Sequence, residues 1–248
     1  MIKRPKPERF RLRRTMMFMN AQKPGLIKDA YIYGCDSIML DLEDAVAENQ
    51  KDAARFSLYH ALTTIDYGST EVIVRINGLD TPHWQEDIRV CVAGGADGIR
   101  IAKCESAQDV KTVEAHVEAA EREFGVEVGR TLLMAARAAG VQCFDTVFTD
   151  LDDEAGFEAE VRQNKAMGFD GKSLINPKQI RLVHEVFAPT AREVAQAEAM
   201  VSAFREAAAA GIGVFTVNGK MVDVAFIPGA ERTLRLAKAC GMYEGDLV

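Results

Sequence analysis

The segment Ser37-Ile-Met-Leu-Asp-Leu-Glu-Asp-Ala-Val-Ala47 carries the strongest indication of how this chain folds. In it, an apolar run leads directly into three carboxylates, Asp41, Glu43 and Asp44. Acidic side chains are costly beside a dry core unless a cation or a hydrogen-bond donor offsets them. In parallel α/β proteins, functional sites form where the strands end. We therefore expect a buried strand of a parallel α/β fold, with an acidic site at its carboxyl end.

Short β-rich runs alternate with amphipathic helical patterns along most of the chain. This order predicts parallel strands joined by right-handed crossovers. The expected strands are 15–20, 37–43, 71–77, 98–103, 131–135, 143–149 and 172–176. The expected helices between them are 50–62, 85–93, 107–124 and 153–167.

Two loops of the same form support a barrel. Gly-Ala-Asp-Gly-Ile-Arg at 95–100 and Gly-Phe-Asp-Gly-Lys-Ser at 168–173 each combine a helix-stopping glycine with a short lead into a strand. This recurrence favours a (β/α) barrel over a dinucleotide-binding sheet, and no GxGxxG follows the first expected strand. We expect an α/β fold of the TIM (β/α)8 type over residues 1–188.

The pattern changes in residues 189–248. Thr190 is a plausible N-cap for a long alanine-rich helix that reaches about residue 210. Asn218-Gly219 between two apolar runs predicts a hairpin with a type I′ turn, and a last helix runs to about Cys240. We expect a helix–hairpin–helix lid that covers the barrel mouth or reaches a neighbouring subunit.

The composition excludes several classes of protein. A net charge of −7 argues against general nucleic-acid binding, and no apolar run approaches the length of a membrane span. The basic first residues lack the apolar stretch of a signal peptide. Five cysteines without a CxxC pair fit reduced thiols in the cytoplasm rather than a disulfide or zinc framework.

One junction breaks the alternation. Between the expected strands 131–135 and 143–149 there is room for only a short link, whereas a parallel crossover needs at least about 10–12 residues. A closed eight-stranded barrel also needs one more strand than the pattern supplies. Either the chain departs from the pattern here or a segment is absent near 135–137.

Several motifs in this order are shared with a known family. They are Asp-Leu-Glu-Asp-Ala-Val (41–46), Val-Arg-Ile-Asn (74–77), Gly-Gly-Ala-Asp-Gly-Ile-Arg-Ile-Ala-Lys (94–103), Cys-Phe-Asp-Thr-Val (143–147), Gly-Phe-Asp-Gly-Lys-Ser-Leu-Ile-Asn-Pro (168–177) and Asn-Gly-Lys-Met-Val-Asp (218–223). The chain resembles the citryl, citramalyl and malyl thioester lyases, the family that includes the citrate lyase β subunit. The resemblance implies a TIM barrel with a C-terminal lid, commonly a homotrimer, that uses Mg²⁺ to cleave a carbon–carbon bond in a 3-hydroxyacyl thioester.

The resemblance also implies a reaction and partners. Agreement across 44–54 and 215–223 favours cleavage of citryl-acyl-carrier-protein to oxaloacetate and acetyl-acyl-carrier-protein, as in citrate fermentation in the cytoplasm. The partners would be the citrate lyase alpha subunit and the acyl-carrier subunit. A citramalyl-CoA or malyl-CoA lyase remains open, and so does a non-catalytic assembly subunit.

The family's metal ligands fall at the broken junction. In family members the strand that matches 132–135 continues into an Ile-Glu-Ser motif, whose glutamate binds the metal, and a later Glu-Asp motif supplies the second ligand. Here Ala136 meets Arg137 directly, a gap of the order of 50–60 residues at about 30 per β/α unit. We assign the metal ligands to no residue of this chain. A true deletion predicts an unclosed barrel without metal-dependent activity.

Arg75 is the first expected site residue. A guanidinium at a strand end can hold a carboxylate or stabilise a thioester oxygen, and the matching family arginine binds substrate. The alternative is a structural ion pair with Asp41 or Glu43. These two acids share one face of their strand and are expected to orient Arg75 and Lys103 or to hold metal-bound waters. Asp44 is expected to point away and to cap the following helix.

Two further residues complete the expected site. Lys103 ends the fourth expected strand, and the resemblance implies that it supports acidic substrate groups electrostatically. The alternative is a Schiff base of the class I aldolase kind. Asp223 follows the hairpin, and the matching family aspartate comes from a neighbouring subunit's lid for acid–base work. The alternative for Asp223 is an aspartate that merely ends the hairpin.

Overall fold

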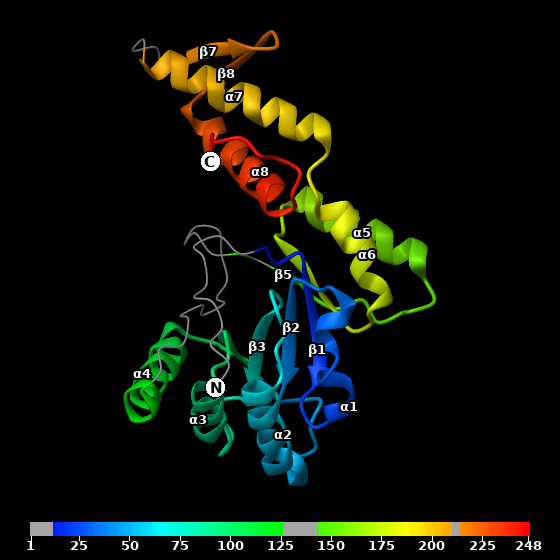
Figure 1. Ribbon diagram of the computed structural model, residues 1–248, viewed down its shortest axis with the longest axis vertical. Helices are drawn as coiled ribbons and strands as arrows, with labels where there is room; N and C mark the ends of the chain where they lie inside the picture. The colour runs from blue at the N-terminus through cyan, green and yellow to red at the C-terminus, as the bar shows by residue number, and fades with distance from the viewer. Residues whose placement is uncertain (1–11, 126–141, 143, 210–213) are drawn as a thin grey trace. The chain divides into compact units, whose positions relative to one another are not determined.

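The computed structural model describes residues 12–125, 142, 144–209 and 214–248 (Figure 1). The described chain divides into two compact units, which separate between His184 and Glu185. The expected strand 131–135 lies outside the described residues. Within the described ranges, no helix combines the length and the apolar character needed to cross a membrane.

The first unit is built on a parallel sheet whose strands stand in the order β4–β3–β2–β1–β6–β5. Its strands are β1 Thr15–Asn20, β2 Ser37–Asp41, β3 Glu71–Ile76, β4 Gly98–Ile101, β5 Phe144–Asp145 and β6 Gly171–Leu174. Six of the predicted strands are therefore confirmed in place. The prediction for 143–149 was too long, because only two residues there pair with β6.

The strand order distinguishes a barrel from a dinucleotide-binding sheet. In the latter the first strand lies centrally and the chain then crosses to strand four, whereas here the last strand, β6, pairs with the first, β1. Joining β4 to β5 would complete the cyclic order of a barrel. The sheet is a curled half-barrel of the TIM type, and among the described strands β4 and β5 are its edges.

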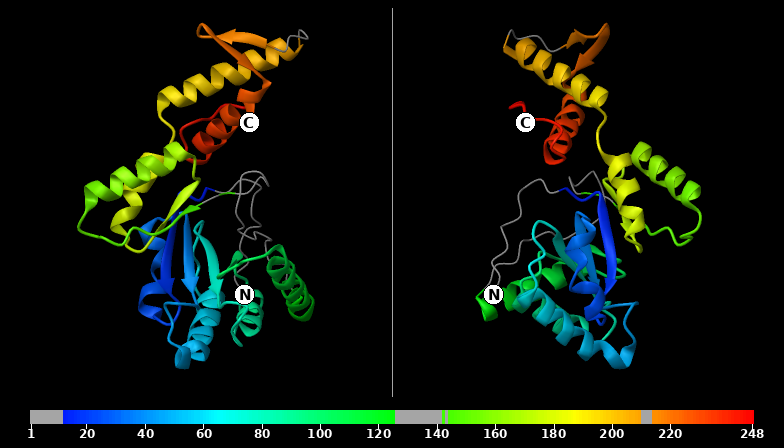
Figure 2. Two further views of the ribbon diagram at one scale, coloured as in Figure 1. Left: turned by 180° about the vertical axis from the view of Figure 1, so that it is seen from behind. Right: turned by 45° about the vertical axis from the view of Figure 1, so that its right-hand side comes forward.

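Helices follow the strands in the predicted alternation (Figure 2). They are α1 Pro24–Ile27, η1 Ala30–Tyr33, η2 Glu48–Gln50, α2 Lys51–Thr64, α3 Trp84–Gly94, α4 Ala107–Phe124, α5 Glu154–Met167 and α6 Lys178–Phe187. Helix α3 packs against α2 on one side and against α4 on the other. The helix-stopping glycines are confirmed, because Gly95 and Gly168 have φ angles of 76° and 93° and cap α3 and α5. The α6 helix was not predicted.

The contact between β6 and β1 depends on Gly171. A Cβ atom at this position would lie 2.2 Å from the carbonyl oxygen of Arg13, so only glycine permits the approach. The next residue, Lys172, is fully buried, and its Nζ donates to Asp145 Oδ2 (2.6 Å) and Glu160 Oε1 (2.5 Å). This lysine thereby joins β6 to β5 and α5.

The inner face of the sheet is arranged in layers, as strand alternation requires. The middle layer is apolar and contains Met16, Met39 and Ile73, with Phe18 and Phe144 packed against it. Toward the amino ends of the strands, the buried carboxylate of Glu71 accepts hydrogen bonds from Arg13 and from Ser37 Oγ. The layer toward the carboxyl ends carries the charges of the candidate site.

The second unit contains a helix–hairpin–helix arrangement. Its elements are α7 Ala191–Ala209, β7 Val214–Val217, β8 Lys220–Asp223, η4 Val224–Phe226 and α8 Ile227–Ala239. The predicted hairpin is confirmed, since Asn218 and Gly219 both have positive φ, 49° and 75°, and β7 pairs antiparallel with β8. Valine and alanine side chains of α7 pack against Leu234 of α8. The function of this unit as a lid stays a prediction.

His184 on α6 contacts the start of the sheet. Its Nε2 lies 2.9 Å from Thr15 Oγ1 and 3.4 Å from Asp36 Oδ1. Burial lowers the pKa of His184, the Asp36 charge opposes that shift, and the Arg14 charge adds to it. Because the folded pKa lies below the unfolded value, the unfolded chain binds more protons in acid. The contribution of neutral His184 to the free energy of unfolding is therefore complete above the unfolded pKa, and it is lost as the pH falls through the folded pKa.

We expect His184→Gln to reduce the loss of stability on acidification. The amide keeps a hydrogen-bonding group beside Thr15 but does not titrate. Urea unfolding at about pH 7.5 and about pH 5.5 measures the difference, which should be smaller for the variant than for the unaltered protein. An equal loss in both proteins would show that His184 does not contribute to the acid sensitivity.

Candidate functional site

The candidate site is a row of charged side chains at the carboxyl end of the sheet. In the strand register, Asp41 of β2 pairs with Arg75 of β3, and Arg75 pairs with Arg100 of β4. Residues paired in this way point to the same face. The prediction that Asp41 and Arg75 meet is confirmed. Arg100 was not predicted as a site residue, although a charged residue between Ile99 and Ile101 is unusual enough to mark it.

Arg75 is held by acids on all its nitrogens. Its Nε and Nη2 each donate to one oxygen of Asp41 at 2.7 Å, and its Nη1 lies 2.8 Å from Glu43 Oε2. Burial alone would lower the pKa of Arg75, but the hydrogen bonds and charge of Asp41 outweigh burial and raise it. The ion pair considered as the structural alternative is therefore present. Substrate binding by Arg75 stays a prediction.

The acidic loop after β2 is fixed through its backbone. The Asp41 carboxylate accepts hydrogen bonds from the amides of Glu43 (3.0 Å) and Ala45 (3.2 Å). From the first residue of α2, the buried Lys51 Nζ donates to the carbonyls of Leu42 and Glu43, both at 2.8 Å. A lysine opposes the helix dipole at this position, and these two carbonyls compensate for it. The sequence analysis did not identify Lys51 as a residue of the site. A lysine at the start of a helix, where a positive charge is unfavourable, was the feature that could have indicated it.

The prediction for Asp44 was wrong. Instead of pointing away, its carboxylate lies 3.4 Å from Arg75 Nη1 and 3.9 Å from Lys103 Nζ. Neither η2 nor α2 has a side-chain cap. The physical reason is that β2 ends at Asp41, so strand alternation no longer sets the direction of Asp44.

Glu43 has one oxygen engaged and one with capacity to spare. Its side chain is buried, and Oε2 pairs with Arg75. The buried Oε1 lies 3.0 Å from Lys103 Nζ, yet it accepts no well-aligned hydrogen bond from the described residues. An oxygen in this state can accept a hydrogen bond from a bound water or a substrate hydroxyl.

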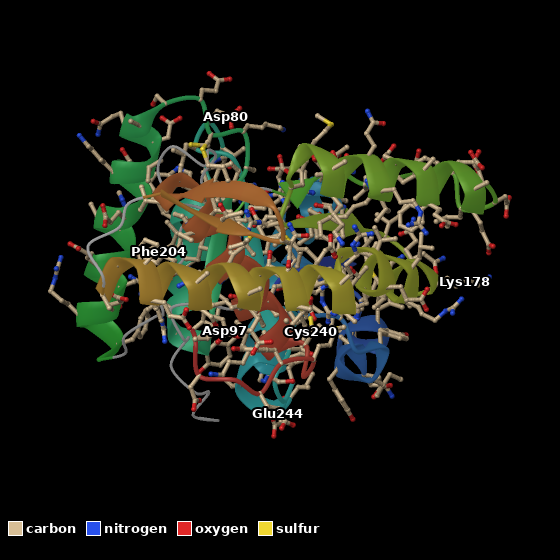
Figure 3. All side chains as sticks on the ribbon, turned by 90° about the horizontal axis from the view of Figure 1, so that it is seen from above. Asp80, Asp97, Lys178, Phe204, Cys240 and Glu244 are labelled. Atoms are coloured by element: carbon tan, nitrogen blue, oxygen red, sulfur yellow. The ribbon has the colours of Figure 1, made fainter. Side chains whose placement is uncertain are left out.

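Lys103 is a solvent-facing cation. Its backbone φ is 47°, and its side chain is 66 % exposed. The Glu43 carboxylate 3.0 Å away and the charges of Asp44 and Asp80 raise the pKa of Lys103 (Asp80 is labelled in Figure 3). Schiff-base formation requires a neutral amine, usually obtained by desolvation. The exposure of Lys103 and its raised pKa therefore favour the electrostatic role over the Schiff base.

Arg100 lies on the same face and differs from Arg75 in its partners. Its guanidinium carbon is 5.4 Å from the ring centre of Phe18, and that of Arg75 is 5.2 Å from the same ring. Among the described residues, its Nη1 donates to the sulfur of Met16, at 3.9 Å, and to no oxygen. Burial and the neighbouring Arg75 charge lower the pKa of Arg100, although it remains a cation. No carboxylate among the described residues forms an ion pair with it.

The described residues do not make a metal site by themselves. Across the described ranges, no three His, Cys, Asp or Glu side chains converge as ligands of one ion. The Asp41 carboxylate, the nearest candidate, is already engaged by Arg75. Asp223, the remaining predicted residue, ends β8 opposite Val214 in the hairpin register. Its acid–base role stays a prediction.

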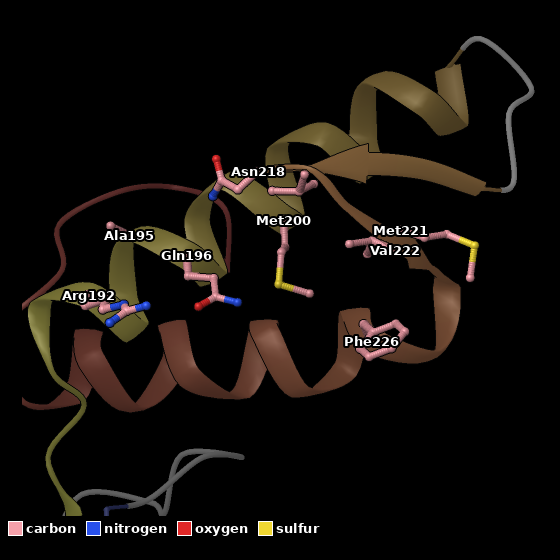
Figure 4. A pocket seen from close by; sticks show the side chains of 9 residues that line it. Arg192, Ala195, Gln196, Met200, Asn218, Met221, Val222 and Phe226 are labelled. Atoms are coloured by element: carbon pink, nitrogen blue, oxygen red, sulfur yellow. The ribbon is translucent and has the colours of Figure 1, made fainter.

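The second unit has a cavity of its own. It measures about 610 Å³ and lies between α7, the hairpin and η4 (Figure 4). Arg192 and Phe226 lie at its two ends, with Met200 between them. Apart from Arg192, Gln196 and Asn218 its lining is apolar, and none of the predicted site residues lines it.

Comparisons with known proteins agree with this architecture. A family model described as HpcH/HpaI aldolase/citrate lyase matches residues 14–136 and again 130–177. The citrate lyase subunit beta of Leuconostoc mesenteroides subsp. cremoris is 42 % identical over 292 aligned positions, covering 95 % of this chain and 97 % of the relative. A (3S)-malyl-CoA thioesterase of Cereibacter sphaeroides is 33 % identical, covering 93 % and 96 %.

A solved structure gives the same result. The protein CitE from Mycobacterium tuberculosis, in complex with magnesium, acetoacetate and coenzyme A, superposes with a TM-score of 0.64 at 28 % identity. The match covers 90 % of this chain and 97 % of that one. The Leuconostoc alignment has 292 positions, 44 more than the 248 residues here, so at least that many positions of the relative lack a counterpart.

We expect Asp41→Asn to destabilise the first unit by about 3 kcal/mol, because removing one partner of a buried pair leaves the other uncompensated. The substitution also weakens the acceptor for two loop amides. Urea unfolding measures the change. Lys103→Met is the matched control, since it removes an exposed charge from the same cluster and should leave stability nearly unchanged. Equal effects of the two substitutions would contradict a structural role for the Asp41–Arg75 pair.

Proposed function

Because the chain belongs to the HpcH/HpaI aldolase/citrate lyase family, we propose that the charged row at the sheet's carboxyl end is the substrate site of a carbon–carbon lyase. The proposed substrate is citryl-acyl-carrier-protein, and the products are oxaloacetate and acetyl-acyl-carrier-protein. The observation that carries the proposal is the placement of Asp41, Arg75 and Arg100 side by side on adjacent parallel strands. In barrel enzymes this end of the strands holds the reacting groups.

The chemistry explains why such a row would be useful. Cleavage is a retro-Claisen reaction, in which a tertiary alkoxide collapses to a ketone while the acetyl thioester leaves as an enolate. The substrate carries several carboxylates, which cationic side chains hold in place. Arg75 and Lys103 are the proposed cations beside the enolate oxygen and the acyl carboxylates. Glu43 Oε1 offers an acceptor for the substrate hydroxyl, and Asp223 is the proposed proton carrier.

The proposed lyase requires Mg²⁺, and we place the residues that would bind it in a segment that this chain lacks. The Mycobacterium structure is named with magnesium, whereas the described residues here offer no metal site. We infer that the metal ligands and one strand belong to a segment absent near 135–137. Two findings support this: the two family-model matches overlap at residues 130–136, and the relative's unmatched positions number at least 44, as expected for more than one β/α unit.

The assembly and domain proposals follow from the same relatives. We propose a barrel domain of residues 1–188 and a lid of residues 189–248, in a homotrimer that works with an alpha subunit and an acyl-carrier subunit in the cytoplasm. The names of the relatives as subunits of citrate lyase support the partners. Free cysteines at 35, 91, 104 and 240 agree with a reducing compartment.

Two other functions have specific support. The malyl-CoA thioesterase relative at 33 % identity supports a lyase acting on malyl-CoA or citramalyl-CoA. A non-catalytic assembly subunit is the second, because the family's two metal-ligand motifs have no counterpart in the sequence near 135–137. The thioester that is cleaved fastest distinguishes a malyl-CoA or citramalyl-CoA lyase from the main proposal. The presence or absence of lyase activity distinguishes the assembly subunit from both.

A chimera tests the lyase proposal. We expect the 248-residue chain, supplied with Mg²⁺ and a citryl thioester, to release no oxaloacetate. Insertion of the corresponding segment of the Leuconostoc relative between Ala136 and Arg137 should produce release that EDTA abolishes. Oxaloacetate is measured by coupled reduction to malate. Citryl-CoA, citramalyl-CoA and malyl-CoA are compared through the acetyl-CoA that each would release, because only citryl-CoA yields oxaloacetate.

The controls follow from the site. Borohydride with oxaloacetate should trap no adduct at Lys103, since its raised pKa keeps the amine protonated. A folded chimera without activity toward any of these thioesters would refute the lyase proposal and favour the assembly subunit. Release by the unmodified chain would refute the proposal that its metal ligands are missing.

An intact mass decides whether the deletion is natural. We expect the protein isolated from its source to weigh more than the 27.2 kDa of this chain by about 5–7 kDa, the mass of nearly two β/α units. Mass spectrometry of the denatured protein is sufficient. A mass equal to 27.2 kDa would establish the deletion as a property of the protein.

A further inference from the structure

The two arginines of the row are partnered very differently. Each nitrogen of Arg75 faces a carboxylate within 2.8 Å. The guanidinium of Arg100 contacts a methionine sulfur and an aromatic ring. A thioether is a weak acceptor, so among the described residues the donors of Arg100 have no strong acceptor.

The position of Arg100 lowers the stability of the fold unless a ligand or another group pairs with its charge. A partly buried charge without a partner loses hydration and gains little in return. The cation–π contact between the Arg100 guanidinium and the Phe18 ring, at 5.4 Å, offsets part of that cost without supplying an acceptor for the N–H donors. The alternation of β4 places Arg100 opposite to Ile99 and Ile101, on the face that carries the charged row.

The charges of the cluster point the same way. Asp41 and Glu43 pair with Arg75 and Lys103 at 3.0 Å or less, whereas Asp44 lies 3.4 Å and 3.9 Å from these two cations. Arg100 balances the third negative charge of the cluster, but it forms no ion pair with a carboxylate of the described residues. An additional anion beside Arg100 would therefore meet an available fork of donors. The planar fork fits a carboxylate through two parallel hydrogen bonds.

We propose that Arg100 binds one of the two carboxylates of the citryl group, both of which stay on the 2-oxo acid after cleavage, while Arg75 holds the acidic loop and faces the enolate oxygen. This inference rests on the proposed function and narrows its substrate class to thioesters of polycarboxylic acids. Arg100 then acts as a specificity residue, which distinguishes a charged acyl group from a neutral one of the same shape. Its effect is on binding, through one charge-assisted contact.

The test measures binding of oxaloacetate by isothermal titration calorimetry, with the full chain and without turnover. Arg100→Met should weaken binding by about 10- to 100-fold, and Arg100→Lys should restore part of it. The matched control is Arg89→Met, an exposed arginine of α3 that pairs with Glu123, which should change little. Dimethyl oxaloacetate, which lacks the charges, should bind equally weakly to the unaltered protein and to Arg100→Met.

Each outcome separates this inference from the lyase proposal. Three results would overturn the role of Arg100. They are no binding of oxaloacetate by the unaltered chain, an affinity of Arg100→Met equal to that of the unaltered chain, and a loss of affinity in Arg89→Met as large as that in Arg100→Met. Binding that depends on Arg100 without release by the chimera supports this inference and refutes the lyase. Release by the chimera with an unchanged KM in Arg100→Met retains the lyase and overturns this inference. Matching urea transitions of the two Arg100 variants show that both are folded.

Discussion

The bidentate pair between Arg75 and Asp41 is the interaction on which the carboxyl end of the sheet depends. It ties β3 to β2, and the same Asp41 carboxylate accepts the amides that turn the chain after β2. Lys51 completes the arrangement by binding the loop carbonyls from α2. The acids at 41–44 are thereby committed to internal partners before any ligand binds, which preorganises the row.

This commitment changes the meaning of the acidic strand end. Clustered carboxylates suggest a cation site, yet here the protein's own guanidinium and ammonium groups are the cations. With Arg75, Lys103 and Arg100 counted against the three acids the cluster is close to neutral, and among the described residues Arg100 is the cation of the three that makes no ion pair. A site of this kind is suited to an anionic ligand, because an incoming carboxylate meets fixed donors and little uncompensated negative charge. Such an arrangement agrees with the proposed polycarboxylate thioester, since the acids already pair with cations of the protein.

Local patterns were sufficient for much of the fold. Alternation of apolar residues located six strands, and glycines with positive φ ended α3 and α5 where expected. The Asn218-Gly219 turn was equally clear, because its backbone conformation is nearly impossible for most other residues. The break near 135–137 was expected from crossover length alone, and it stays a prediction because it lies outside the described residues. These features depend on neighbours in the sequence, and so the sequence is enough to read them.

Other features depended on partners distant in the sequence. Asp44 faces Arg75 because the strand stops at Asp41, and a strand end is set by pairing with the neighbouring strand. The importance of Arg100 emerged only when the register placed it beside a saturated arginine and an aromatic ring. Composition, strand pattern and family motifs were thus legible in the chain of residues, whereas the choice of which charge pairs with which required three-dimensional neighbours. The physical reason is that the energies of ion pairs and stacking depend on distances of a few ångströms between residues far apart in the chain.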